Sequence, residues 1–69
     1  MPKFYSSDYI IKVLRRKGFV FVSQKGSHMK FQKASLPLTV IVPANRKEIP
    51  IGTFRSILRQ SKLKDEDFK

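Results

Sequence analysis

Hydrophobic residues recur at helical spacing in two stretches of the chain and at strand spacing between them. In residues 7–17 and 50–61 apolar side chains return every three or four positions, which is the pattern of a helix with one buried face. Residues 19–24, 27–33 and 38–42 are instead rich in β-branched and aromatic side chains, as strands are. The pattern predicts a small α+β domain with the order helix, three strands, helix, in which a three-stranded antiparallel sheet carries both helices on one face.

The ends of both predicted helices are marked by residues that commonly begin or stop a helix. Ser6 or Ser7 can cap the first helix, and Asp8 places a negative charge at its positive end. Gly18 supplies the left-handed residue that stops this helix. Pro50 suits the first turn of the second helix, because a proline there loses no hydrogen bond.

The turn around Gly26 decides which residues of the first two strands face each other. Lys-Gly fits poorly to a two-residue turn with two positive φ angles, so we predict a three-residue loop in which Gly26 is left-handed and forms a bulge. Ser23 would then lie opposite Ser27, Phe21 opposite Met29, and Phe19 near Phe31. The predicted core contains Phe21, Met29, Phe31, Leu14 and Leu58.

The only histidine of the chain, His28, follows this turn directly and would face away from the helices. An imidazole can take up and release protons near neutral pH, and the neighbouring Lys25 and Lys30 suit a phosphate-bearing substrate. A lone strand histidine is nevertheless more often a solvated surface residue than a catalyst. The candidate catalytic residue is His28, and the candidate RNA-binding residues are Lys25, Gly26, Ser27, Lys30, Arg46 and Lys47.

Two further groups of basic residues have a simple structural interpretation. Arg46 and Lys47 fit a solvated loop and a phosphate contact equally well. Arg55, Arg59 and Lys62 would form a ridge on the second helix, for which exposure to solvent is explanation enough.

Length and charge describe one small, strongly basic domain. The 69 residues form a single domain, 1–69, with a core in about residues 5–63 and a tail, 64–69, that is expected to fray. Its 15 Lys and Arg against 5 Asp and Glu give a net charge of +10, which attracts polyanions and above all nucleic acid. A solubilising surface without chemistry would give the same count. The basic residues are scattered over every segment, which argues against membrane binding by one amphipathic helix.

The residue types present exclude several kinds of site. With no cysteine and one histidine the chain cannot form a zinc site of several such ligands, so we predict no metal and no cofactor. It has neither a glycine-rich phosphate loop nor a Ser/His/Asp set. No apolar run has the length of a transmembrane helix, and the first residues lack the features of a secretory signal. We therefore expect a soluble, cytoplasmic protein.

Several motifs spread over about residues 5–63 resemble the HicA toxin family. The most specific is a pairing of Gly26-Ser27-His28 at the second strand with Gly52-Thr53-Phe54-Arg55-Ser56-Ile57-Leu58 at the last helix. The other matching motifs are Gly18-Phe19, Gln24-Lys25, Phe31, Val42-Pro43 and Lys47-Glu48-Ile49-Pro50.

The resemblance implies the toxin of a type II toxin-antitoxin system. Such a protein is a small endoribonuclease with a double-stranded-RNA-binding-domain-like fold, which acts on mRNA and is neutralised by a cognate HicB antitoxin. The family's catalytic histidine corresponds to His28. Some members carry a second histidine where this chain has Met29, and many carry one where it has Ala44. Roles of those accessory histidines therefore cannot apply here.

Metal-free cleavage of the RNA backbone fits this set of residues, with His28 accepting the proton of the attacking 2′-hydroxyl or donating one to the leaving oxygen. The fold resemblance does not make the substrate a duplex, because function resides in the site. The alternatives are a non-catalytic basic RNA-binding module and a protein that only binds other proteins. The chain is compatible with a monomer.

Overall fold

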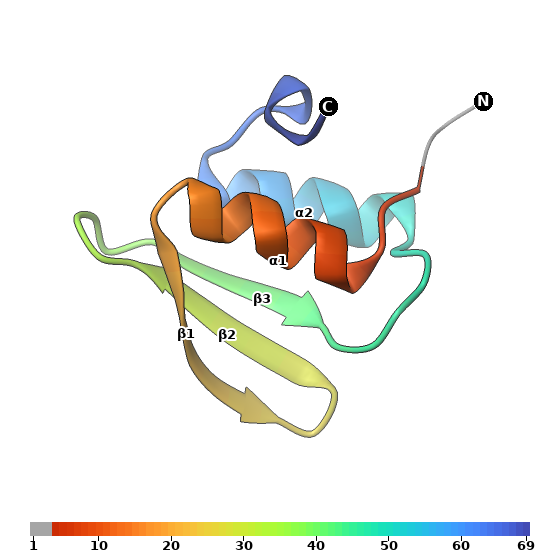
Figure 1. The fold of residues 1–69 in the computed structure, drawn as a ribbon, viewed down its shortest axis with the longest axis horizontal. Coiled ribbons are helices and arrows are strands. Elements are labelled where there is room, and N and C mark those ends of the chain that lie inside the picture. Colours follow the sequence, from red (N-terminus) through yellow and green to blue (C-terminus); the bar gives the residue numbers. More distant parts are fainter. Residues whose placement is uncertain (1–3) are drawn as a thin grey trace.

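The computed structural model describes residues 4–69 and has the predicted order of elements. Both helices pack on the same face of a three-stranded antiparallel sheet with strand order β1-β2-β3, as Figure 1 shows. The α+β class and the arrangement of the layers are therefore confirmed. The elements are α1 (Ser7–Arg16), β1 (Phe19–Lys25), β2 (His28–Lys33), β3 (Thr39–Pro43), α2 (Ile51–Ser61) and a 3₁₀ turn, η1 (Asp65–Phe68).

The residues predicted to begin and end the helices do so. Ser6 is the N-cap of α1, and its Oγ accepts a hydrogen bond from the Tyr9 N–H at 3.1 Å. Gly18, with φ of +96°, lets the chain leave α1 and enter β1. Pro50 immediately precedes α2. Both helices consequently end within one residue of the predicted positions.

The core lies between the helices and the sheet. Leu14 and Phe31 are fully buried, while Met29 and Leu58 are partly buried and pack against the core, as predicted. Phe21 was also predicted to be in the core, but this is wrong because it is 47% exposed. The buried apolar residues are Tyr5, Ile10, Val13, Leu14, Phe19, Phe31, Val40, Val42, Ala44, Ile49, Phe54, Ile57 and Phe68.

The predicted register of the first hairpin is also wrong. Lys25 pairs with His28, so the turn has only two central residues, Gly26 and Ser27. Gly26 has φ of +60° and Ser27 has no positive φ, which is the arrangement of a type II′ turn. The bulge lies further along β1, where the register shifts between Phe21 and Ser23.

The register error leaves the faces of β2 and of Phe19 to Phe21 unchanged, but beyond the bulge Ser23 pairs with Lys30 and so lies on the face away from the helices. Phe21 pairs with Phe31 instead of Met29, a displacement of two residues, and side chains two apart lie on the same face. Phe21 therefore faces the helix side, with its ring edge-on to that of Phe31 at 5.8 Å between centroids. Its exposure arises because the hairpin extends beyond the helices (Figure 1).

The tail, 64–69, is packed and ordered, so the expectation that it frays is wrong. Phe68 is fully buried, and its ring contacts those of Tyr5 and Phe54. The Tyr9 hydroxyl donates a hydrogen bond to the Phe68 carbonyl at 2.5 Å. Buried aromatic area of this kind outweighs the entropy of ordering a few terminal residues.

Within residues 4–69, no helix has the length and apolar character needed to cross a membrane.

Candidate functional site

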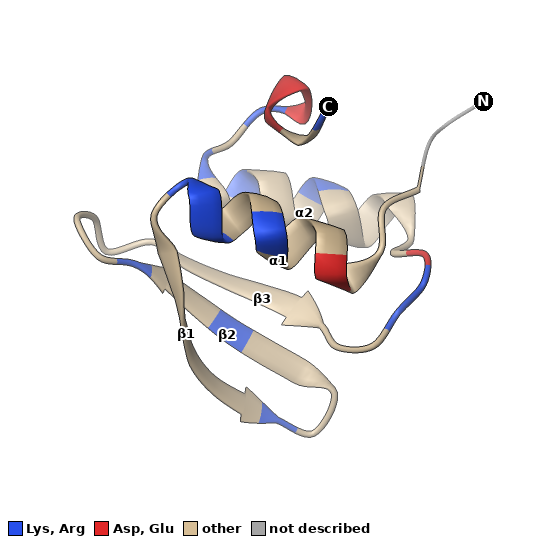
Figure 2. Cartoon of the chain, in the orientation of Figure 1, with Lys and Arg blue, Asp and Glu red and all other residues tan. Residues whose placement is uncertain are grey.

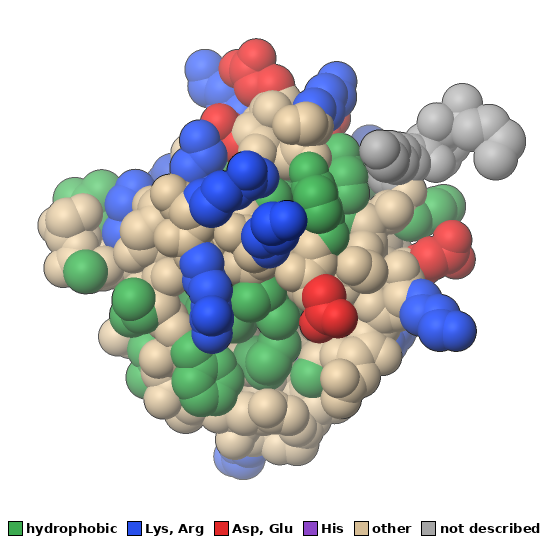
Figure 3. Space-filling view, viewed as in Figure 1, with side chains coloured by type: hydrophobic (Ala, Val, Ile, Leu, Met, Phe, Trp, Pro, Cys, Tyr) green, Lys and Arg blue, Asp and Glu red, His purple; other side chains and the backbone are tan. Residues whose placement is uncertain are grey.

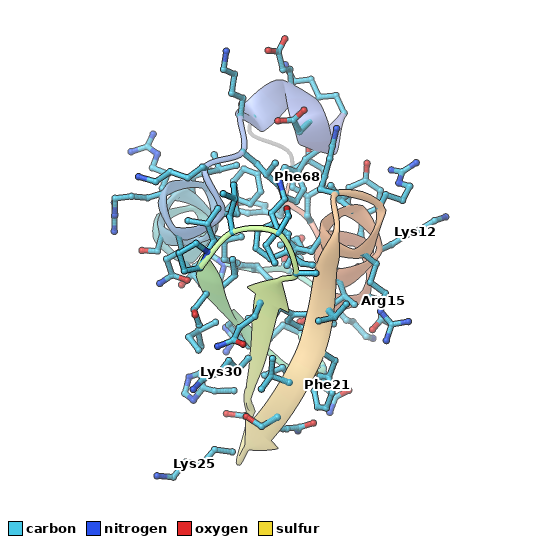
Figure 4. All side chains as sticks on the ribbon, turned by 90° about the vertical axis from the view of Figure 1, so that its left-hand side faces the viewer. Lys12, Arg15, Phe21, Lys25, Lys30 and Phe68 are labelled. Carbon is cyan, nitrogen blue, oxygen red and sulfur yellow. The ribbon has the colours of Figure 1, made fainter. Side chains whose placement is uncertain are left out.

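His28 lies on the open face of the sheet, opposite the helices. It is the first residue of β2 and is exposed, and it pairs with Lys25 of β1 on one side and Pro43 of β3 on the other. Lys30 lies two residues further on the same face and is exposed as well. Phe21, which pairs with Phe31, lies on the helix side of the sheet, and Figure 4 labels both Phe21 and Lys30 on the lower part of the hairpin. The three side chains Lys25, His28 and Lys30 thus share one surface.

The turn before His28 is held by hydrogen bonds on both sides. The Gln24 Nε2 donates to the Gly26 carbonyl at 2.9 Å, within the hairpin. The Ala44 N–H donates to the Ser27 carbonyl at 2.7 Å, which joins the turn to the end of β3. A positive φ at Gly26 favours glycine, since other residues are strained in that conformation. The Gly-Ser-His sequence therefore fixes where the imidazole is presented.

The surroundings of His28 are positive and hold no carboxylate partner. Among residues 4–69, no hydrogen bond or ion pair joins the imidazole to an acidic side chain. The acidic residues lie on α1, in the β3–α2 connection and on η1, all away from the open face (Figure 2). The same residues contain no group of three or more His, Asp or Glu that could hold a metal ion. The arrangement offers one proton-transfer group beside two cations suited to phosphate.

Arg46 and Lys47 are exposed but do not lie on this face of the sheet. They belong to the connection between β3 and α2, beyond Pro43. The structure therefore brings together His28, Lys25, Lys30, Gly26 and Ser27, and places the other two candidates at the end of the sheet nearest His28.

Ser7 is a positioning residue that the sequence alone did not identify. It is 1% exposed; its Oγ donates to the Pro43 carbonyl at 2.6 Å and accepts from the Arg46 N–H at 3.0 Å. Its own N–H donates to the Arg46 carbonyl at 2.9 Å. The tandem serines were the available signal, because only one of the two can be the N-cap and the other is free for another role.

Met29 and Ala44 stand where related sequences carry accessory histidines, and the two positions differ in how they lie relative to His28. Met29 faces the helices and packs against the core, on the opposite side of the sheet from the imidazole. Ala44 is buried and joined to the turn through its N–H bond to Ser27. The backbone of position 44 therefore lies next to the turn before His28, whereas the side chain at position 29 points away from the imidazole.

The family model described as the HicA toxin of bacterial toxin-antitoxin systems matches residues 7–63. The chain belongs to the HicA toxin family. The match begins at the first residue of α1, ends just after α2 and includes the Gly-Ser-His turn. It stops before η1, so the packed tail lies outside the matched region. Among individually curated proteins, no significant match was found.

Proposed function

We propose that this HicA family protein is a metal-independent endoribonuclease that cleaves mRNA in the cytoplasm, with His28 as its single catalytic residue. The observation that supports this most is the exposed imidazole of His28 on the open face, between Lys25 and Lys30, in the family's Gly-Ser-His sequence. Family membership and the net charge of +10 support RNA as the substrate.

The proposed reaction is attack of a ribose 2′-hydroxyl on the neighbouring phosphorus. A bond forms from the 2′-oxygen to phosphorus while the bond from phosphorus to the 5′-oxygen breaks, which leaves a cyclic phosphate and a free 5′-hydroxyl. His28 either accepts the proton of the attacking hydroxyl or donates one to the departing oxygen, and water exchanges the other proton.

One proton-transfer group is sufficient for a modest nuclease. General acid or base catalysis typically contributes about 10² to 10⁴-fold in rate. Lys25 and Lys30 add electrostatic stabilisation, because charge builds up on the phosphate oxygens as the transition state forms. Both lysines are exposed and free to approach a phosphate that lies over the sheet.

The protein partner that we propose is a HicB-type antitoxin that covers the open face. An antitoxin could neutralise the toxin by placing acidic side chains against Lys25 and Lys30, or a segment of chain over His28. We expect a saturating concentration of the cognate antitoxin to displace RNA from the toxin and to protect His28 from reaction with diethyl pyrocarbonate. Full reactivity of His28 in an inhibited complex would contradict this and require an indirect mechanism.

The second candidate function is a non-catalytic RNA-binding module. It is favoured by one observation: among residues 4–69, no carboxylate or second imidazole accompanies His28 to complete a catalytic pair. Such a module would bind RNA through its basic residues and leave it intact.

The deciding experiment is RNA cleavage by the His28→Ala variant in the presence of a chelator. We expect cleavage and toxicity to be lost while the fold and most of the RNA affinity remain, because His28 is exposed and its removal opens no cavity. Gln32→Ala is the matched control, since Gln32 is an exposed residue on the same strand and face. Cleavage at the native rate by His28→Ala would favour the binding module.

A further inference from the structure

A cavity of about 340 Å³ opens at the end of the molecule where the start of α1 lies beside the connection between β3 and α2. Figure 1 shows these two segments next to each other, close to the described start of the chain. The volume is within the range of small-ligand sites. The cavity is lined by Phe4, Tyr5, Ser6, Tyr9 and Lys47.

Aromatic rings dominate this lining, and those of Tyr5 and Tyr9 are held by contacts within the fold. The rings of Tyr5 and Tyr9 are stacked, 5.1 Å apart between centroids and 16° from parallel. The Tyr9 hydroxyl is already used in its hydrogen bond to the Phe68 carbonyl. Phe4 is 44% exposed, a large apolar side chain with an open ring surface. The cavity therefore offers flat apolar surfaces, which suit a planar partner.

Among residues 4–69, Lys47 is the one charged group in the lining, and its segment is anchored. Ser7, in the first turn of α1, bonds to both Pro43 and Arg46, so the chain just before Lys47 cannot move independently of α1. The Ile49 N–H donates to the Tyr5 carbonyl at 2.9 Å just beyond it. The rings of Tyr5 and Tyr9 and the segment that carries the cation are thus preorganised relative to each other.

The cavity is within reach of a strand of RNA that contacts His28. Pro43 is the β-sheet partner of His28, and Lys47 follows it by four residues. Four residues of chain span at most roughly 14 Å, even when fully extended. The same hydrogen bonds that anchor Lys47 also fix Pro43, so the distance between the cavity and the imidazole is set by the fold.

We propose that this cavity binds one unpaired base of the RNA, with the rings of Phe4 and Tyr9 against the base and Lys47 at an adjoining phosphate. Stacking on aromatic side chains is how proteins hold splayed-out bases, whereas a base inside a duplex has both of its faces covered. The inference rests on the proposed function and specifies its substrate as RNA that is single-stranded beside the cleaved bond.

Fluorescence of the Phe4→Trp variant tests the contact directly. The chain has no tryptophan, so this residue would be the only one. In a His28→Ala background, which keeps the RNA intact, we expect a mixed-sequence single-stranded RNA to quench the emission to saturation. The same RNA annealed to its complement should not quench it. Unchanged emission while anisotropy shows bound single strand, or equal quenching by the duplex, would overturn the proposal.

Affinity measurements on the same background give an independent readout. Phe4→Ala should weaken single-strand binding roughly 5- to 100-fold, the range expected for one lost base stack, and leave duplex binding unchanged. Leu36→Ala is the control, because Leu36 is 51% exposed in the β2–β3 connection, at the other end of the sheet (Figure 1). Unaltered single-strand binding by Phe4→Ala, together with RNA cleavage by the native chain, would refute only the base site. An absence of RNA binding by the native chain would refute both proposals.

Discussion

Two phenylalanines of the hairpin face each other and yet differ in how much they stabilise the fold. Phe31 is 1% exposed beneath the helices, whereas Phe21, its partner on β1, is 47% exposed. The two rings are in edge-to-face contact. Both residues take part in the same ring contact, so the difference between them is one of burial.

Replacing each of these residues by alanine should separate burial from ring contact. Phe31→Ala is expected to destabilise the protein by about 3–5 kcal/mol, because it leaves a cavity in the core. A domain of this size has about 3–10 kcal/mol of total stability, so this variant should be largely unfolded. Phe21→Ala should lower stability by less than half as much. Thermal unfolding followed by circular dichroism measures both, and equal effects would contradict this account.

The face on which His28 stands follows from the alternation of side chains along β2. Met29 and Phe31 pack toward the core, so His28 and Lys30 must point the other way. This alternation made the face of His28 and Lys30 predictable from the sequence, whereas Lys25 was expected in the loop and instead pairs with His28. The role of the imidazole in catalysis stays a prediction.

At the level of elements, the order of helices and strands was predictable while the register of the first hairpin was not. Helix caps and apolar spacing are local signals. The register depended on a type II′ turn at Gly26 together with a bulge in the middle of β1, and the two features together place Phe21 opposite Phe31 instead of Met29. Both the predicted and the observed registers place Phe19 and Phe31 on the core side, so hydrophobic pattern cannot distinguish them.

The packed turn η1 shows tertiary contacts overriding a weak local signal. The segment 64–69 was expected to fray as terminal segments do, but Phe68 is buried among the aromatic rings of Tyr5 and Phe54. Asp67 closes the turn locally, since its carboxylate accepts a hydrogen bond from the Lys64 N–H at 2.8 Å.

The pH dependence of η1 should follow the Asp67 carboxyl group. The hydrogen bond from the Lys64 backbone lowers the pKa of Asp67 below its usual value near 4, and the nearby Lys17 lowers it further. A lowered pKa in the folded state means that the ionised group stabilises the fold above the unfolded pKa and loses this effect as pH falls through the folded value.

We therefore expect Asp67→Ala to reduce the melting temperature at neutral pH and to match the native protein in strong acid. Glu66→Ala is the control on the same exposed turn and should track the native protein at each pH. A melting-temperature difference for Asp67→Ala that stays constant down to strong acid would show that the ionised carboxylate is not responsible.

At the scale of the whole molecule, surfaces assembled from distant segments could not be predicted. The base-binding cavity combines the start of the chain with the β3–α2 connection, about forty positions apart, and no local pattern marks it. Its link to His28 depends on Ser7, whose side chain bridges the same two segments. Val20 pairs with Gln32 on the open face of the sheet, whereas Phe21 is exposed because the hairpin extends past α1. Figure 3 shows hydrophobic side chains gathered there, below the basic side chains of α1.

The distribution of charge suits RNA binding in which the field of the whole molecule attracts the RNA and a few residues contact its phosphates. Lys and Arg occur on both helices and the sheet, and acidic residues are concentrated on η1 (Figure 2). Such a field attracts a polyanion from any direction, but only lysines that touch phosphate release counterions on binding.

The salt dependence of RNA binding can therefore distinguish the residues in contact from those that only contribute to the field. For the His28→Ala protein, a plot of log affinity against log salt should fall linearly and steeply. Lys30→Ala should reduce the slope by about 0.7, the value for one phosphate of a single strand, because Lys30 shares the open face with the imidazole. Arg55→Ala on α2 removes the same charge from an exposed position across the sheet and should leave the slope unchanged. If both variants reduced the slope equally, RNA would contact the helix layer as well, and the open face would not be the principal binding surface.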